Sequence, residues 1–188
     1  MKSFRKFVLP PIAVGVAFLS LVLRAVAEEP PNIVFILVDD QRHDTLGCAG
    51  HPIIKTPTID RLAEEGVRFE RAYVNSPICM ASRATLFSGL TETGHGFTGG
   101  PAPAIPLQAM DVDTSVPVLL RKAGYRTGFF GKQHVRFAEG NDPAMERMFD
   151  EYRVVNGGPH HMELEDGTTR HTAEVIGDES VAFLQAQP

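Results

Sequence analysis

The residues best suited to chemistry form one short stretch, Cys79 to Gly89, with the sequence Cys-Met-Ala-Ser-Arg-Ala-Thr-Leu-Phe-Ser-Gly. Pro77 ends the segment before it, and residues 81–87 suit a short helix that Gly89 terminates. Cys79 then lies at or just before a helix N-terminus, where free N–H groups and the helix dipole favour an anion. Arg83 lies one turn further on the same face, and its planar guanidinium suits charged oxygens. The stretch predicts a nucleophile beside an anion-binding position, with a buried structural cysteine as the alternative.

Two consecutive carboxylates, Asp39 and Asp40, form a second candidate site directly after the apolar run 32–38. That run is β-branched and apolar, which is typical of a strand buried on both faces. Open α/β sheets bind ligands at the carboxyl ends of such strands. Adjacent carboxylates repel each other unless a cation lies between them, and calcium or magnesium prefers oxygen ligands. The pair therefore predicts a metal site, with a solvated turn as the alternative.

Lys132 and His134 form a third candidate, after a predicted strand over residues 125–130 that ends at Gly131. Both should project from the same sheet edge as the two aspartates. Taken alone, this Gly-Lys-x-His pattern is more typical of a solvated loop.

Other histidines are weaker candidates. His95 lies in the Gly- and Pro-rich segment 91–110, where a histidine either borders a site or, more usually, is simply exposed. We expect no metal role for the remaining cluster, which lies in a polar region that resembles a hairpin: His160, His161 and His171.

The elements that must position these residues alternate between helix and strand. Helices are predicted from Thr56 and Pro57 to Gly66, from Ser115 to Gly124, and over 172–185, with Thr56 and Ser115 as caps. A further strand is predicted over 67–74.

Composition places the chain among ordinary soluble domains. It has 188 residues, a net charge of −5 and a hydrophobic fraction of 43%, with no basic excess that would indicate nucleic acid. Lys2, Arg5 and Lys6 precede an apolar run, and Ala25-Val26-Ala27 offers a cleavage site. Residues 1–27 are thus predicted to be a signal peptide of a secreted or periplasmic protein, with no stable membrane span after cleavage. An uncleaved anchor is the alternative.

The pattern Cys79-x-Ala81-x-Arg83, followed by Ser88-Gly89, resembles the active-site signature of the type I sulfatases, part of the alkaline-phosphatase-like superfamily. Ser88 stands where threonine is usual. Asp39-Asp40 and Gly131-Lys132-x-His134 also match segments of that family, in the same order along the chain. Gln133 stands where the family often has tryptophan.

This resemblance implies an α/β fold with a mostly parallel central sheet flanked by helices, truncated before the C-terminal part. Residues 28–188 would be the N-terminal part of the catalytic domain, since family members are considerably longer. A maturation enzyme would convert Cys79 to formylglycine, whose hydrated aldehyde attacks the sulfur of a sulfate ester. Asp39, Asp40 and residue 79 would hold Ca²⁺, with Mg²⁺ less favoured. Arg83 and Lys132 would stabilise the charged oxygens, and His134 would act as a base.

The implied function is a sulfuric ester hydrolase that acts on a small sulfate ester or a sulfated carbohydrate. A metal-dependent phosphodiesterase or phosphonate monoester hydrolase of the same superfamily is one alternative, and a secreted remnant without activity is another. A free Cys48, or a Cys48–Cys79 disulfide in the absence of modification, is compatible with export. The 188-residue chain alone is expected to be weakly active or inactive.

Overall fold

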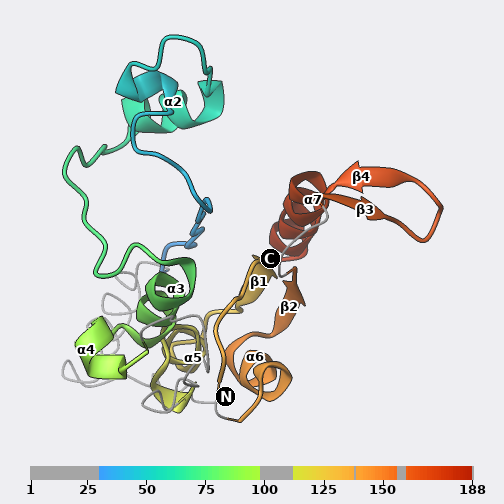
Figure 1. The fold of residues 1–188 in the computed structure, drawn as a ribbon. Coiled ribbons are helices and arrows are strands. Elements are labelled where there is room, and N and C mark those ends of the chain that lie inside the picture. The colour runs from blue at the N-terminus through green and yellow to red at the C-terminus, as the bar shows by residue number, and fades with distance from the viewer. Residues whose placement is uncertain (1–29, 98–111, 138, 156–159, 188) are drawn as a thin grey trace, which may run out of the picture. The chain divides into compact units, whose positions relative to one another are not determined.

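The structure is a computed structural model that describes residues 30–97, 112–137, 139–155 and 160–187 (Figure 1). By its internal contacts the chain divides into two compact units, residues 1–38 and residues 39–188. The predicted signal peptide, residues 1–27, lies outside the described residues. Among the described helices, none combines the length and apolar character needed to cross a membrane.

Residues 30–38, the described part of the first unit, form an extended chain that is not part of a sheet. Its apolar side chains are exposed, from 43% for Leu37 to 75% for Ile36. The prediction of a buried strand over 32–38 is therefore wrong. A β-branched run favours the extended conformation, but a strand also needs a partner that the run itself does not encode. The two strand pairs of the described residues do not include it.

The second unit begins with a small substructure of a 3₁₀-helix, η1 (Gly47–Ala49), and α2 (Pro57–Glu65). Asp60 joins them, because its Oδ1 accepts hydrogen bonds from the Cys48 N–H and the Thr56 hydroxyl, each at 2.7 Å. A Cβ at Gly47 would lie 2.2 Å from Asp60 Oδ2, so this close approach requires glycine. Pro57 opens the helix as predicted, but Thr56 makes no side-chain cap because its hydroxyl bonds Asp60 instead.

The segment that follows α2 is irregular. Val67, Phe69 and Tyr73 are 79%, 78% and 88% exposed, and none of them lies in a strand. The predicted strand over 67–74 is therefore also wrong. Its alternating pattern is compatible with a strand, but the described residues offer it no paired neighbour.

Several further helices follow in this unit. Ser115 precedes α5 and Pro117 lies in its first turn, as predicted, although the buried Ser115 side chain forms no cap bond. The bounds are α3 (Cys79–Ser88), α4 (Glu92–His95), the 3₁₀-helix η2 (Val112–Thr114), α5 (Val116–Lys122) and α6 (Asn141–Met148).

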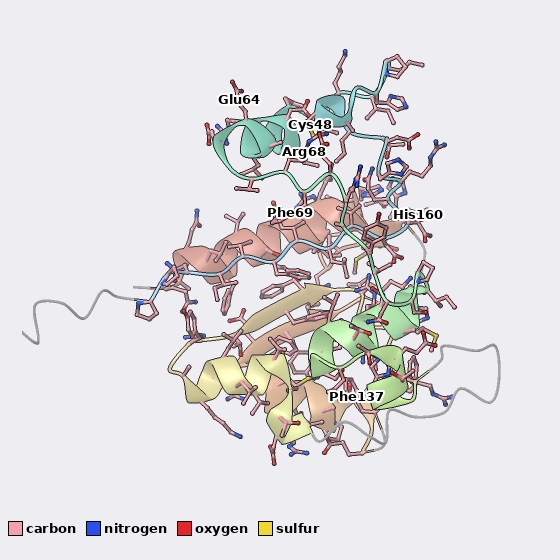
Figure 2. All side chains as sticks on the ribbon, turned by 90° about the vertical axis from the view of Figure 1, so that its left-hand side faces the viewer. Cys48, Glu64, Arg68, Phe69, Phe137 and His160 are labelled. Atoms are coloured by element: carbon pink, nitrogen blue, oxygen red, sulfur yellow. The ribbon has the colours of Figure 1, made fainter. Side chains whose placement is uncertain are left out.

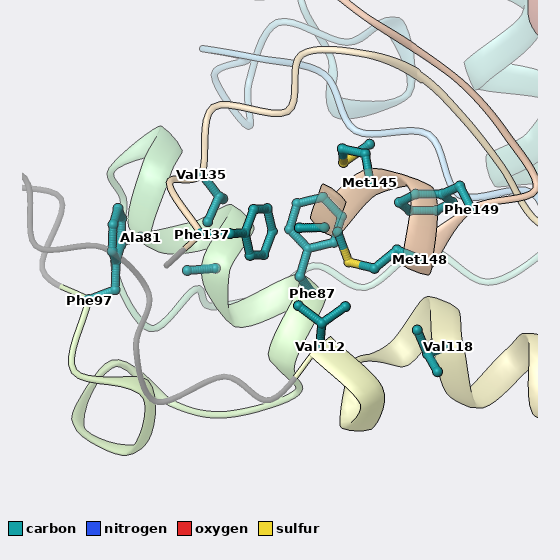
Figure 3. Packing of buried hydrophobic residues seen from close by; sticks show 12 residues of the cluster. Ala81, Phe87, Phe97, Val112, Val118, Val135, Phe137, Met145, Met148 and Phe149 are labelled. Atoms are coloured by element: carbon teal, nitrogen blue, oxygen red, sulfur yellow. The ribbon is translucent and has the colours of Figure 1, made fainter. Parts of the chain in front are cut away.

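The hydrophobic core lies where α3, α5 and α6 meet the strands (Figure 3). Phe87 of α3 is its centre, with ring centroids 5.9 Å from Phe129 and 6.3 Å from Phe149. Ala81 and Ala84, on the same helix, are fully buried. Their small side chains let α3 approach the core closely, so the helix that carries Cys79 is packed tightly against the core.

Strands β1 (Gly128–Gly131) and β2 (Glu151–Val154) pair in parallel, with Gly128 opposite Glu151 and Gly131 opposite Val154. Helix α6 lies between them in the chain and provides the crossover that parallel strands need. The predicted α/β class with a parallel sheet is confirmed. Strand β1 is shorter than the predicted 125–130 and includes Gly131.

The chain continues through an antiparallel hairpin, β3 (His161–Glu163) and β4 (Thr169–His171), into α7 (Thr172–Gln185), as predicted. Helix α7 packs on β1. A Cβ at Gly128 would lie 2.9 Å from the Phe183 ring, so glycine lets the helix and strand meet.

Candidate active site

Cys79 is the first residue of α3, and its thiol is half-buried and free. The residue before it, Ile78, is extended and cannot cap the helix. Because an α-helix leaves its first N–H groups without intrahelical partners, these donors lie around the backbone of Cys79. The position of Cys79 at a helix start is therefore as predicted.

The far end of α3 is fixed by Ser88 and Gly89. The Ser88 hydroxyl donates to the Ala84 carbonyl at 2.7 Å and accepts from the Leu90 N–H at 3.1 Å. Gly89 has φ 69°, a left-handed conformation that glycine adopts readily. The serine in place of threonine thus retains a hydroxyl that terminates the helix.

Arg83 lies one turn after Cys79 and is 7% exposed. Its Nη1 donates to the Lys132 carbonyl, and its Nη2 donates to Asp39 Oδ1 at 3.3 Å. Among the described residues, its buried Nε has no hydrogen-bond partner. An unpaired buried donor is costly unless an acceptor arrives, so Arg83 retains one N–H suited to an anionic oxygen.

Lys132 lies directly after β1, and its Nζ is 2.6 Å from Asp39 Oδ2. Asp39 thus contacts Lys132 through one oxygen and Arg83 through the other. The hydrogen bond from Lys132 and then that from Arg83 hold the pKa of the Asp39 carboxyl below its ordinary value, against an opposing effect of burial. The structure therefore brings together Asp39, Arg83 and Lys132, three of the predicted site residues.

Two further predicted site residues have unusual backbones. Asp40 has φ 54° and His134 has φ 50°, and they are the non-glycine residues with positive φ in the described part of the chain. Left-handed conformations cost free energy for residues with a Cβ and are concentrated at functional sites. Asp39, Arg83 and Lys132 are called the charged cluster below. Asp40 directly follows Asp39, and His134 lies two residues after Lys132.

The environment of His134 favours its neutral form. Burial lowers the pKa of its imidazole, and the nearby charges of Lys132 and Arg83 lower it further, while Asp39 acts in the opposite direction. A neutral imidazole can accept a proton near neutral pH.

Asp39 and Asp40 supply carboxylate oxygens, the donors that hard divalent cations prefer. Asp40 is exposed and forms no ion pair within the described residues. That part of the chain contains no group of three or more His, Cys, Asp or Glu placed to hold a metal ion. The two aspartates thus fit a divalent cation by donor type.

Cys48 and Cys79 are both free cysteines in the structure, so no disulfide joins them. Cys48 belongs to the η1–α2 substructure, where its carbonyl accepts a hydrogen bond from Arg68 Nη1 at 2.7 Å (Figure 2). Cys79 is therefore left available for modification.

His95 differs from the sequence expectation, because it is only 2% exposed. It ends the short helix α4, and its two ring nitrogens contact Phe97 and Thr85. No signal in the sequence predicts this burial of His95, since a His-Gly pair in a Gly-rich segment indicates a loop. Gln133, which stands where the family often has tryptophan, is fully buried, and its Nε2 donates to the Val135 carbonyl at 2.5 Å.

His161 and His171 have structural contacts. His171 Nδ1 accepts the Ala173 N–H at 3.1 Å and so caps α7. The rings of His161 and His171 lie edge to face, with centroids 5.3 Å apart across the hairpin.

Comparison with known proteins gives a consistent result. The Sulfatase family model matches residues 31–188. The chain is 40% identical over 105 residues to an arylsulfatase of Clostridium perfringens, covering 56% of this chain and 21% of that protein. It is 37% identical over 138 residues to the N-acetylgalactosamine-6-sulfatase of Mus musculus, covering 69% of this chain and 26% of that protein.

Among solved structures, one similar protein is in complex with its substrate D-glucosamine-2-N,6-O-disulfate. The match has a TM-score of 0.65 and 28% identity, and it covers 84% of this chain and 32% of that one. The chain therefore spans about a quarter of the length of the curated relatives described above.

Proposed function

The chain belongs to the sulfatase family, and from this we propose that it carries the nucleophile and anion-binding part of a site that hydrolyses sulfate esters. One observation carries the proposal: Arg83 and Lys132 meet at Asp39, beside the helix that Cys79 begins. Two cations at a helix N-terminus suit a small dianion or a sulfate ester better than a neutral ligand.

In the proposed site, Arg83 and Lys132 bind the anionic oxygens of the sulfate group. The unpaired Nε–H of Arg83 is the donor available for this contact, and Lys132 adds a compact charge. Asp39 orients both cations through its two oxygens. Neutral His134 takes a proton during turnover.

Residue 79 supplies the nucleophile in this proposal. A maturation enzyme converts Cys79 to formylglycine, which would supply a hydrated aldehyde in place of a thiol. The half-buried, unpaired Cys79 is compatible with that conversion. The first-turn N–H groups of α3 then favour negative charge on the attacking oxygen.

We also propose Ca²⁺ as the metal, with Asp39, Asp40 and residue 79 among its ligands. Calcium is preferred over magnesium because it accepts adjacent carboxylates in flexible geometry. When bound, it would supply Lewis-acid stabilisation of charge on oxygen. Chelation should abolish activity, and Ca²⁺ should restore it at lower concentration than Mg²⁺. Restoration by Mg²⁺ alone would contradict this assignment.

A sulfated carbohydrate is the proposed substrate class. Support comes from the similar N-acetylgalactosamine-6-sulfatase and from the similar protein with bound D-glucosamine-2-N,6-O-disulfate. An arylsulfatase is also similar, so a 4-nitrophenyl sulfate assay is a suitable first screen. A sulfated N-acetylhexosamine should be cleaved with a higher kcat/KM than the aryl ester.

Residues 28–188 are proposed to be part of an exported catalytic domain, with residues 1–27 removed as a signal peptide. Mass spectrometry of the protein from its native host tests this proposal and the nucleophile together. Mature protein should begin at Glu28, and residue 79 should be lighter than cysteine by about 18 Da. An unmodified Cys79 in a host that matures other sulfatases would contradict the nucleophile assignment.

Substitution of Lys132 tests its role in binding the sulfate group, and a comparison of substrates separates sulfate-ester hydrolysis from the superfamily alternative. Lys132→Met should lower kcat/KM for 4-nitrophenyl sulfate by about 10²-fold, the typical effect of removing one charge-stabilising donor. Lys122→Met, on the exposed end of α5, is the control. If a phosphonate monoester were hydrolysed faster than any sulfate ester, the phosphonate hydrolase alternative would replace this proposal.

A further inference from the structure

His95 is among the most deeply buried polar residues of the described chain, at 2% exposure, and lies outside the charged cluster. Its Nδ1 accepts the Phe97 N–H at 3.0 Å, and its Nε2 is 3.0 Å from Thr85 Oγ1. Neighbouring Phe97 is 1% exposed, so the imidazole lies in an apolar setting with both nitrogens bonded.

These contacts determine the tautomer. A backbone N–H can only donate, so Nδ1 must be the unprotonated nitrogen. In the neutral ring the proton then resides on Nε2, which donates to the Thr85 hydroxyl oxygen. Burial lowers the pKa of His95, with a smaller opposing effect from Glu92, and so favours this neutral form.

The partner of His95 belongs to the helix of the candidate site. Thr85 lies in α3 two residues after Arg83 and six after Cys79. Helices α3 and α4 are also in contact. The opposite side of α3 is held by Phe87 in the core. A second contact at Thr85 therefore limits rotation of α3 about its own axis, the motion that would turn Arg83 away from Asp39 and Lys132.

We propose that His95 is a positioning residue for the active site, which acts by donating its Nε2–H to Thr85 and so fixing the orientation of α3. It does not touch substrate. The expected effect of His95 on catalysis rests on the proposed sulfatase function, but its expected effect on the reactivity of the Cys79 thiol does not.

Two amide substitutions separate the contacts of His95. In His95→Gln the side-chain NH₂ can take the place of Nε2–H and donate to Thr85. In His95→Asn the shorter side chain can replace only Nδ1 and accept from Phe97. If the Thr85 contact positions α3, His95→Asn should lower kcat/KM for 4-nitrophenyl sulfate, mainly by lowering kcat. The expected loss is about fivefold, which corresponds to one neutral hydrogen bond. His95→Gln should recover most of that loss.

Thr85→Val provides an independent check. Thr85→Val should lose about as much activity as His95→Asn. The variant that carries both substitutions should lose no more than either single variant, because each of them removes the same hydrogen bond between His95 and Thr85. Fully additive losses would overturn the proposal, as would a His95→Asn variant that retains full activity.

A second readout does not depend on sulfatase activity. Protein made without the maturation enzyme retains the Cys79 thiol, and Cys48→Ser removes the other cysteine. The rate of Cys79 alkylation by iodoacetamide should rise severalfold in His95→Asn and Thr85→Val and change little in His95→Gln. Equal rates in all variants would overturn the positioning role. A wild-type protein without sulfatase activity, but with this alkylation pattern, would contradict the proposed function and support the role of His95.

Discussion

Asp39 is the residue on which the charged cluster depends, because it forms ion pairs with both Lys132 and Arg83. Arg83 is held by a backbone group as well, since its Nη1 donates to the Lys132 carbonyl. The two left-handed residues, Asp40 and His134, lie within two positions of Asp39 and Lys132. At the residue scale, the site thus combines close charges with backbone conformations that most side chains disfavour.

Substitution of His134 should separate backbone strain from chemistry. Asparagine tolerates left-handed φ whereas valine does not, so His134→Val should lower the free energy of unfolding by about 1 to 2 kcal/mol relative to His134→Asn. Both variants should lose activity if His134 takes the proton. Urea denaturation checks the first expectation, and two variants of equal stability would show that φ 50° is not costly here.

At the scale of elements, Asp150 connects α5, β1 and β2. Its Oδ2 accepts from the Thr127 N–H at 2.8 Å, and its Oδ1 is 2.8 Å from Arg121 Nη2. Thr127 directly precedes β1 and Asp150 directly precedes β2. Asp150 thus aligns the starts of the two parallel strands, while the opposite end of β1 leads to Lys132.

Asp150→Asn should lower the free energy of unfolding at pH 7 by about 1 kcal/mol, a value reduced for the partial exposure of the ion pair. Burial raises the pKa of Asp150, but the hydrogen bonds from Thr127 and the charge of Arg121 together hold it below 3.8, the ordinary value. The folded-state pKa is therefore depressed, so the stabilisation is present above pH 3.8 and is lost as the pH falls through the folded-state pKa.

Chemical denaturation of both proteins between pH 7 and pH 3 measures this dependence. The stability difference between wild type and Asp150→Asn should shrink in acid. Glu146→Gln is the control, since its carboxylate forms no ion pair within the described residues and lies exposed on α6. A difference that stays constant over this pH range would contradict the assigned ionisation.

At the scale of the whole molecule, a large apolar surface is exposed. The run from Ile33 to Val38 exposes every side chain by 43% or more. Exposed apolar runs with strand propensity are sites of association. The chain therefore presents an aggregation hazard that its net charge of −5 only partly offsets.

The double substitution Phe35→Ser and Ile36→Ser should lower ANS fluorescence by about half and slow aggregation followed by light scattering, because it interrupts this run. Leu119→Ser, which removes a single exposed side chain from α5, should change neither signal appreciably. Unchanged ANS binding in the double variant would show that the run is covered in solution.

Helices and turns could be predicted from the sequence because their signals are local: Pro57, Pro117 and Gly89 mark helix ends in the structure as they do in the sequence. Strands were wrongly predicted over 32–38 and 67–74, because strand formation requires a distant partner that a local pattern does not reveal. The meeting of Asp39, Arg83 and Lys132 was predictable from the resemblance, although the strand expected before Asp39 does not form. The burial of His95 was not, since it depends on how α4 packs against α3.

The ion pair between Asp39 and Lys132 has a consequence for how the protein folds. The two residues are 93 positions apart in the chain, and Asp39 and Arg83 are 44 apart. Closing such long loops costs conformational entropy, and a partly exposed ion pair offsets little of that cost. The contacts of Phe87 within the hydrophobic core can form earlier, because burial of its ring stabilises them more. We therefore expect the charged cluster to assemble after the transition state. Asp39→Asn should then speed unfolding and leave the refolding rate nearly unchanged, which corresponds to a kinetic φ-value near zero.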